Sequence, residues 1–208
     1  MHIAEGVLSA PVLITGAVVA AGAVAYGLKK LDPRQVMMAA ILGAAFFVAS
    51  LIHIPVGPSS VHLLLNGLLG VLLGWSAVPV IFVGLLLQAI LYGFGGLTVL
   101  GVNTATMGLG AVLSWYIFGG LLSVLKPLGA KKAAAVSGFV SGACGVAIAF
   151  TDEGFKASAV MLLAAHLPVM LIEGIVTAVA VSFIARVRPA LLPETTRLKL
   201  AGMIPPAE

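Results

Sequence analysis

Two adjacent residues at the start of the chain, Met1 and His2, have donor atoms that together could bind a metal ion. A bulky second residue generally prevents removal of the first Met, so we expect Met1 to keep its free amine. That amine, the His2 backbone nitrogen and the His2 imidazole can form two fused chelate rings in one plane. A fourth nitrogen would complete the square-planar geometry that is typical of Ni(II) or Cu(II). The alternative is that His2 is an ordinary residue on a frayed terminus.

The best candidate for the fourth nitrogen is His62, which we expect at the outer end of an apolar segment. Imidazole is a common ligand of late divalent metals. The alternative for His62 is a polar side chain at the membrane interface. Asn66 follows four residues later, so a helix would place both residues on one face. Asn66 could then hold the His62 ring or a loop carbonyl, or could hydrogen-bond to another helix.

Other polar residues in apolar stretches are further candidates for the site. His53 could be a ligand, or it could cap the end of a helix, which is the role we favour. Gln88 and Asn103 could line the pocket or brace a loop, although such residues more often hydrogen-bond between membrane helices. His166 and Glu173 lie seven residues apart on one helical face. They could form a proton relay, but we favour a structural hydrogen-bonding role for them.

The composition is that of an integral membrane protein. Of 208 residues, 61% are hydrophobic and 9% are charged, whereas about 25% are charged in soluble domains. The mean hydropathy is +1.20. We therefore relate the net charge of +4 to membrane topology, and we expect no nucleic-acid partner. No Walker motif, HExxH motif or aligned carboxylate pair is present, so neither ATP hydrolysis nor another enzymatic activity is expected.

The apolar runs predict an all-α fold with seven transmembrane helices in one domain, residues 1–208. The predicted helices are at about 11–27, 35–54, 60–74, 78–94, 104–125, 131–150 and 157–185. Residues 1–10 would form an N-terminal metal-binding segment, residues 11–187 the seven helices, and residues 188–208 a cytoplasmic tail.

The basic residues predict the orientation of these helices. In a seven-span arrangement, ten of the eleven Lys and Arg residues fall on one side, and Lys156 falls on the other. By the positive-inside rule, the C-terminus is cytoplasmic and the N-terminus is outside. This orientation also places the uncharged connections at 53–62 and 95–104 outside, where they could fold over a site.

Four blocks of the chain, in the same order, resemble patterns of a known family. They are Met1-His2-Ile3-Ala4-Glu5-Gly6, the segment 58–67 (PSSVHLLLNG), the segment 88–103 (QAILYGFGGLTVLGVN) and the segment 165–174 (AHLPVMLIEG). With these blocks, the chain resembles the CbiM/NikM proteins over essentially residues 1 to 185. Those proteins are the substrate-capture (S) components of nickel and cobalt energy-coupling-factor transporters.

The resemblance implies an S-component bundle with an extra N-terminal helix, in a prokaryotic cell (inner) membrane. It implies that Ni(II) or Co(II) is bound by the Met1 amine, the His2 backbone nitrogen, the His2 ring and His62. The implied partners are a transmembrane coupling (T) protein, two ABC-type ATPase subunits, a small accessory membrane subunit and membrane lipid. No cofactor is implied beyond the transported ion. An alternative function is an autonomous proton-coupled carrier or channel that uses His166 and Glu173.

Overall fold

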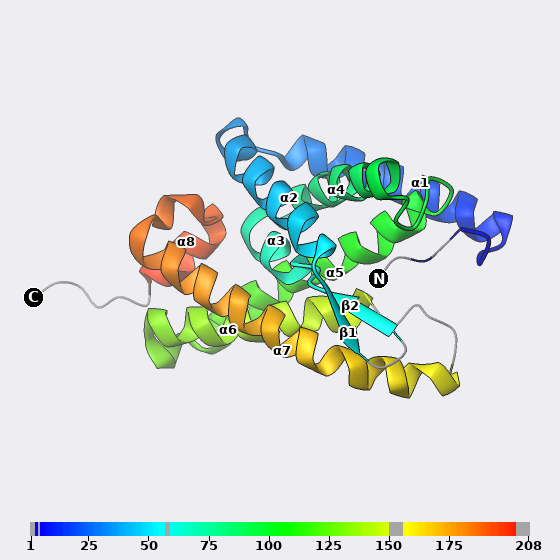
Figure 1. Cartoon of the computed structure of the whole chain (residues 1–208). Coiled ribbons are helices and arrows are strands. Elements are labelled where there is room, and N and C mark those ends of the chain that lie inside the picture. The colour runs from blue at the N-terminus through cyan, green and yellow to red at the C-terminus, as the bar shows by residue number, and fades with distance from the viewer. Residues whose placement is uncertain (1–2, 4, 57–58, 150–155, 203–208) are drawn as a thin grey trace, which may run out of the picture.

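The computed structural model of the chain describes residues 3, 5–56, 59–149 and 156–202, without the side chains of residues 53–61, 131 and 145–166. It is a bundle of α-helices with one antiparallel β-hairpin (Figure 1). The elements are α1 (Ala10–Lys30), α2 (Val36–Leu51), β1 (His53–Val56), β2 (Ser59–His62), α3 (Asn66–Leu73), α4 (Ala77–Tyr92), α5 (Leu100–Val124), α6 (Gly129–Ala149), α7 (Lys156–Val187) and α8 (Glu194–Ala201).

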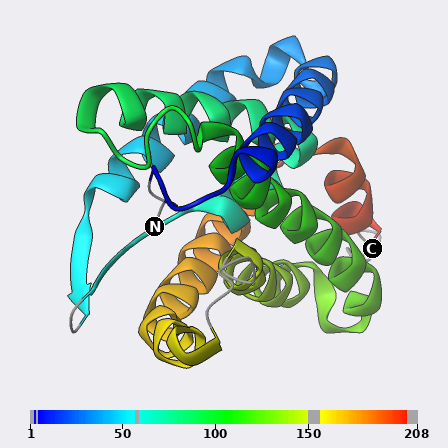
Figure 2. The same ribbon diagram turned by 90° about the vertical axis from the view of Figure 1, so that its right-hand side faces the viewer.

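The short helix α3 lies at the centre of the bundle. In Figure 1, α1, α2 and α4 form one layer, α6 and α7 form another, and α3 and α5 lie between them. Figure 2 shows the same arrangement from the side. All eight residues of α3 are buried, because α3 packs against α5, α6 and α7. The residues that precede α3 therefore enter the interior of the protein.

The chain reverses direction between α3 and α4. Gly70 of α3 lies against the backbone of Ala111 in α5, whereas Val78 at the start of α4 packs against Gly108, one turn back along α5. The reversal occurs at Gly74, whose φ of 57° is readily adopted only by glycine. The apolar run from 66 to 92 is thus a hairpin of two antiparallel helices.

The predicted membrane helix at 60–74 is partly wrong. Residues 59–62 are in strand β2, which pairs with β1 in the register His53 opposite His62, and the helix begins only at Asn66. A carboxylate from α7 accepts the backbone N–H groups of Leu64 and Leu65. These two groups are thereby satisfied without continuing the helix backwards.

Within the described residues, five helical segments are long and apolar enough to span a membrane, compared with seven predicted. They are Ala10–Lys30, Pro33–Leu51, Asn66–Tyr92, Leu100–Val124 and Leu167–Val187. The third of these has the length and composition of a span but contains both α3 and α4, between which the chain reverses direction. Helix α6, whose side chains are described only in part, is not among them. The apolar side chains exposed along α1, such as Val18 and Ile14, are suited to contact with lipid.

Candidate metal site

The first described residue of the chain, Ile3, is held at its backbone by Asn103. The Ile3 N–H donates to Asn103 Oδ1 at 3.0 Å, and Asn103 Nδ2 donates to the Ile3 carbonyl at 3.3 Å. Asn103 lies in the first turn of α5 and is 5% exposed. A primary amide has one acceptor and one donor side, so it can satisfy both backbone groups of a single residue. Asn103 was predicted to line a pocket or brace a loop, and it braces the N-terminal segment.

Glu5 attaches the same segment to the connection between α4 and α5. Its backbone N–H donates to the Gly95 carbonyl at 3.1 Å. Its Oε1 accepts the backbone N–H and the hydroxyl of Thr98, each at 3.0 Å. These two hydrogen bonds, that of the Thr98 N–H first, lower the pKa of Glu5, because they stabilise the ionised carboxylate. Glu5 is therefore ionised at neutral pH.

Gly96 makes room for the Glu5 side chain. A Cβ atom at Gly96 would overlap the Glu5 carboxyl group, and Gly96 also has a φ of +107°. Neither condition suits a residue with a side chain. The connection of residues 93–99, with Asn103, therefore forms a shaped cradle for the start of the chain; this set is called the N-terminal cradle below.

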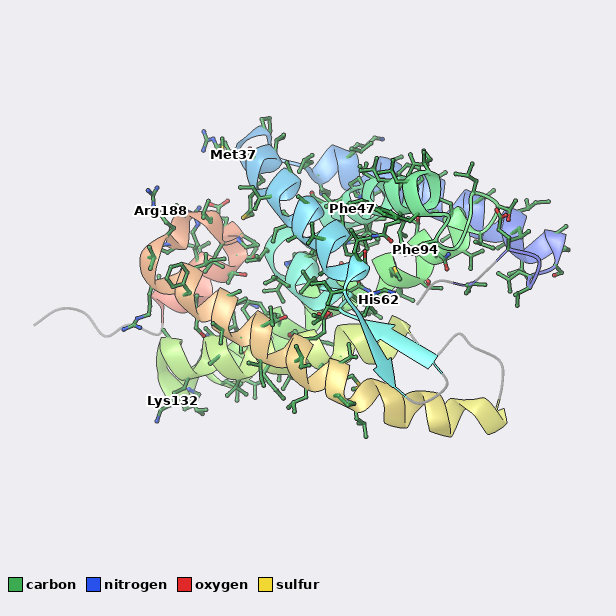
Figure 3. All side chains as sticks on the ribbon, viewed as in Figure 1. Met37, Phe47, His62, Phe94, Lys132 and Arg188 are labelled. Carbon is green, nitrogen blue, oxygen red and sulfur yellow. The ribbon has the colours of Figure 1, made fainter. Side chains whose placement is uncertain are left out.

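His62 approaches the interior at the end of β2. Figure 3 shows it at the base of the hairpin, where the chain passes into the bundle. Its side chain is only 5% exposed, and its Nδ1 lies 3.3 Å from the Leu63 carbonyl oxygen. A carbonyl oxygen can only accept, so this contact places the proton on Nδ1 and leaves the lone pair of the neutral ring on Nε2. Nε2 is thus the nitrogen suited to bind a metal.

Asn66 does not have the predicted relation to His62. The two residues are not on one helical face, because His62 ends a strand and the helix starts at Asn66. Between them, Leu65 has a φ of +51° and breaks any helical periodicity. Asn66 is fully buried, and within the described part of the chain its amide makes no hydrogen bond. The predicted support of His62 by Asn66 is therefore not seen in these contacts.

Gln88 joins two helices instead of reaching the cradle. Its Nε2 donates to Ser50 Oγ at 2.6 Å, and Ser50 in turn donates to the Phe47 carbonyl at 2.7 Å. Gln88 is fully buried, so this contact links α4 to α2 inside the protein. This is the helix-packing role that was the alternative for Gln88.

Glu173 is a structural hydrogen-bonding residue, as the sequence analysis favoured. Its Oε1 accepts the backbone N–H groups of Leu64 and Leu65, each at 2.6 Å, and the side chain is fully buried. Sequence reasoning missed these two donors, which lie more than 100 residues away along the chain. It also missed the role of Glu5, for which the adjacent Gly95-Gly96 pair was the available signal.

The remaining predicted site residues lie partly or wholly outside the description. Met1 and His2 are not among the described residues, and nor are the side chains of His53 and His166. The described side chains contain no group of three or more His, Cys, Asp or Glu residues that could hold a metal. The predicted donor set draws mainly on the chain start and on backbone nitrogen, so it would not form such a group.

Comparison with known proteins now identifies the family. The family model described as "Cobalt uptake substrate-specific transmembrane region", CbiM, matches residues 2–191. The chain belongs to the CbiM family. It is therefore a transmembrane component of cobalt uptake and not an enzyme.

Relatives of similar length support this assignment. A protein of Haemophilus influenzae that is named for metal transport is 38% identical over 205 residues, which are 94% of this chain and 98% of the relative. The cobalt transport protein CbiM of Sorangium cellulosum is 32% identical over 227 residues, covering 97% and 98% of the two chains. The crystal structure of a truncated transition metal transporter superposes with a TM-score of 0.63 at 24% identity, over 89% of this chain and 96% of that one. It shows that the fold is shared.

Proposed function

We propose that this CbiM protein is the substrate-capture subunit that presents Ni(II) or Co(II) for ATP-driven uptake. The ion would be held in a square-planar, all-nitrogen site made by the Met1 amine, the His2 backbone nitrogen, the His2 ring and the His62 ring. Such a planar nitrogen set suits late divalent metals. The ion is the transported substrate and not a resident cofactor.

The observation that carries this proposal is the double hydrogen bond between Ile3 and Asn103. A peptide chain advances at most about 3.6 Å per residue. Fixing both backbone groups of Ile3 therefore restricts donors on the two preceding residues to the neighbourhood of the cradle. Ordering a chain terminus costs conformational entropy, and these hydrogen bonds offset part of that cost before the metal arrives.

The proposal is also supported by His62, the donor that the rest of the chain would add to those of the N-terminus. It is buried, and its Nδ1 contact prepares the tautomer in which Nε2 can bind metal. A hydrogen bond on the second ring nitrogen is the usual way in which proteins orient a ligating histidine. Cu(II) would bind such a nitrogen set at least as tightly in water, so selectivity would depend on metal availability and on the rigidity of the cavity.

Binding should become weaker as the solution becomes more acidic. The Met1 ammonium and the His2 amide must each lose a proton, and both imidazoles must be neutral, before all four nitrogens can bind. Each requirement disfavours the protonated form of a donor, so each of them lowers the metal affinity as the pH falls.

The proposed orientation has the N-terminal cradle outside and the basic end inside. Figure 3 shows Met37, Lys132 and Arg188 toward one end of the bundle, whereas His62 and Phe94 lie away from it. An excess of Lys and Arg is typical of the cytoplasmic side. ATP hydrolysis would come from two ABC-type ATPase subunits, joined through a T protein and a small accessory membrane subunit.

The decisive experiment adds the three residues Gly-Ser-Gly before Met1, so that the free amine moves away while every native side chain remains. A single added residue is avoided because it would make the terminus a new amine, amide and imidazole chelate. Detergent-purified protein would be titrated with Ni(II) and Co(II) by calorimetry, beside His2→Ala and His62→Ala variants. We expect the extension and His2→Ala to weaken binding at least about 100-fold, because each removes chelate-ring donors. The same three residues added after Glu208 are the matched control. Affinity that survives the N-terminal extension would contradict the proposal.

The alternative of a proton-coupled carrier is favoured by one observation, the burial of Glu173 in α7. It predicts metal uptake by this chain alone in proteoliposomes under a proton gradient, without nucleotide. We expect no such uptake, since Oε1 of Glu173 is already engaged by two backbone N–H groups. Uptake that depends on the proton gradient, and that is lost in Glu173→Gln, would favour the carrier.

A further inference from the structure

The short connection from His62 to Asn66 is attached to α7 by one buried side chain. Glu173 Oε1 accepts the N–H groups of Leu64 and Leu65 at 2.6 Å each, and Glu173 has no exposed surface. We propose that Glu173 is a positioning residue, which sets the orientation of the His62 ring for metal binding. This inference rests on the proposed function of His62.

One peptide unit links Glu173 to the His62 ring. The Leu63 carbonyl accepts from His62 Nδ1 at 3.3 Å, and the N–H of the same peptide, that of Leu64, donates to Glu173 at 2.6 Å. A peptide unit is planar and rigid. When Glu173 fixes its N–H, it also fixes the direction of the carbonyl that orients the imidazole. The carboxylate thus acts on the ligand through a single rigid group.

The connection would not keep this shape by itself. Leu65 has a φ of +51°, a left-handed conformation that is unfavourable for a residue with a branched side chain. Such a conformation persists when the surroundings impose it. In addition, backbone N–H groups that lie just before a helix have no acceptor within it and need one elsewhere when they are buried. Glu173 Oε1 supplies that acceptor for Leu64 and Leu65, the two residues that precede α3.

Glu173 itself is held in a tight helix contact. A Cβ atom at Gly67 of α3 would overlap the backbone of Gly142 in α6, and one at Gly142 would meet the Glu173 carbonyl and Thr177. The three helices α3, α6 and α7 are therefore in backbone contact at this level. The position of the carboxylate is fixed by packing, so it can transmit that position to the connection.

Two conservative substitutions distinguish the length of the Glu173 side chain from the chemical type of its acceptor group. Glu173→Asp keeps the carboxyl group but withdraws it by one methylene, whereas Glu173→Gln keeps the length and one carbonyl acceptor. For a positioning role, we expect Asp to weaken Ni(II) affinity about tenfold, the range found for residues that orient metal ligands. We expect Gln to weaken it only about threefold, since its neutral oxygen is the weaker acceptor. A proton-relay role predicts the reverse order, and that result would overturn the inference.

A double-mutant cycle tests whether Glu173 acts through His62. The Glu173 variants are combined with His62→Ala, and Ni(II) affinity is measured by calorimetry on the full chain. We expect the loss caused by Glu173→Asp, and the smaller loss caused by Glu173→Gln, to disappear when the imidazole is absent. A loss that persists unchanged beside His62→Ala would overturn the inference. No effect of His62→Ala by itself would instead contradict the proposed function, so the two failures are distinguishable.

Thr177→Val is the matched control on the same helix. Thr177 is buried one turn from Glu173, and its hydroxyl has no hydrogen-bond partner within the described residues. We expect unchanged Ni(II) affinity. Thermal unfolding without metal identifies variants that do not fold. If Glu173→Asp is among them, the Glu173→Gln cycle decides, and a Gln variant with wild-type affinity would then overturn the inference.

Discussion

The two sides of the proposed site are attached to the protein in different ways. The N-terminal segment is held at its edge by hydrogen bonds that water can reach, since the Glu5 contacts to Thr98 are exposed and those of Asn103 are half-buried. The connection after His62 is held by a fully buried carboxylate inside a three-helix contact. The first attachment competes with water, and the second does not.

The connection after His62 is therefore called the fixed side of the site, and the N-terminal segment is the more loosely attached side. Exposed hydrogen bonds contribute little net free energy, whereas breaking a buried one leaves polar groups without partners. Local opening therefore favours the N-terminal segment. We therefore expect substitutions in the N-terminal cradle to affect metal binding more than the stability of the fold. The predictions below test this contrast.

The largest effect is expected for Gly67→Ala on the fixed side. The added methyl would overlap the Gly142 backbone and separate α3 from α6. Overpacking of this kind costs about 1–3 kcal/mol, and we expect the upper part of that range as a lower thermal unfolding temperature without metal. Gly22→Ala in α1 is the control, because a Cβ there meets nothing within 4 Å. Equal unfolding temperatures for the two variants would contradict a rigid contact at α3.

Asn103→Leu should mainly affect metal binding. The variant keeps the volume but removes both hydrogen bonds to Ile3. At about 1 kcal/mol for each bond, the loss corresponds to about 30-fold in affinity. Thermal stability without metal should change little. Thr104→Val, at the adjacent buried residue, is the control in the same calorimetric titration. A large loss of stability with unchanged affinity would place Asn103 on the fixed side.

Gly96→Ala should weaken metal binding about tenfold, because its methyl displaces Glu5 from the cradle. Gly93→Ala provides a close control. Gly93 also has a positive φ, of +67°, but a Cβ there meets nothing within 4 Å. It therefore imposes backbone strain in the same connection without touching Glu5. Equal losses for the two variants would show that strain in the connection, and not the Glu5 contact, controls binding.

Glu5→Gln should have the smallest effect, a few-fold loss of affinity, because its contacts are exposed. Hydrogen bonds to Thr98 lower the Glu5 pKa from its ordinary 4.5. For a lowered pKa, the stabilising contact is complete above the ordinary value and is lost as the pH falls through the lower one. The ratio of wild-type to Glu5→Gln affinities should therefore stay constant between about pH 6 and 8. A ratio that changes in this range would mean that Glu5 titrates there.

The membrane class and most helices could be predicted from the sequence, because apolar length and charge bias are local properties. The predicted helices near 11–27 and 104–125 correspond to α1 and α5. The segment at 60–74 was not predicted correctly. Its hydropathy does not distinguish a helix from a strand followed by a half-length helix, and the choice depends on a carboxylate 109 residues away from Leu64.

In the candidate site too, one part could be predicted from the sequence and another part could not. The sequence by itself predicted Met1, His2 and His62 as donors, since a terminal amine, an adjacent histidine and a second imidazole are chemically distinctive. Only the tertiary structure assigned Asn103 and Glu5 to the chain start, and Glu173 to the connection after His62. Residue type determines which atoms can bind a metal. Their hydrogen-bond partners are decided by helix packing, which brings together residues about 100 positions apart.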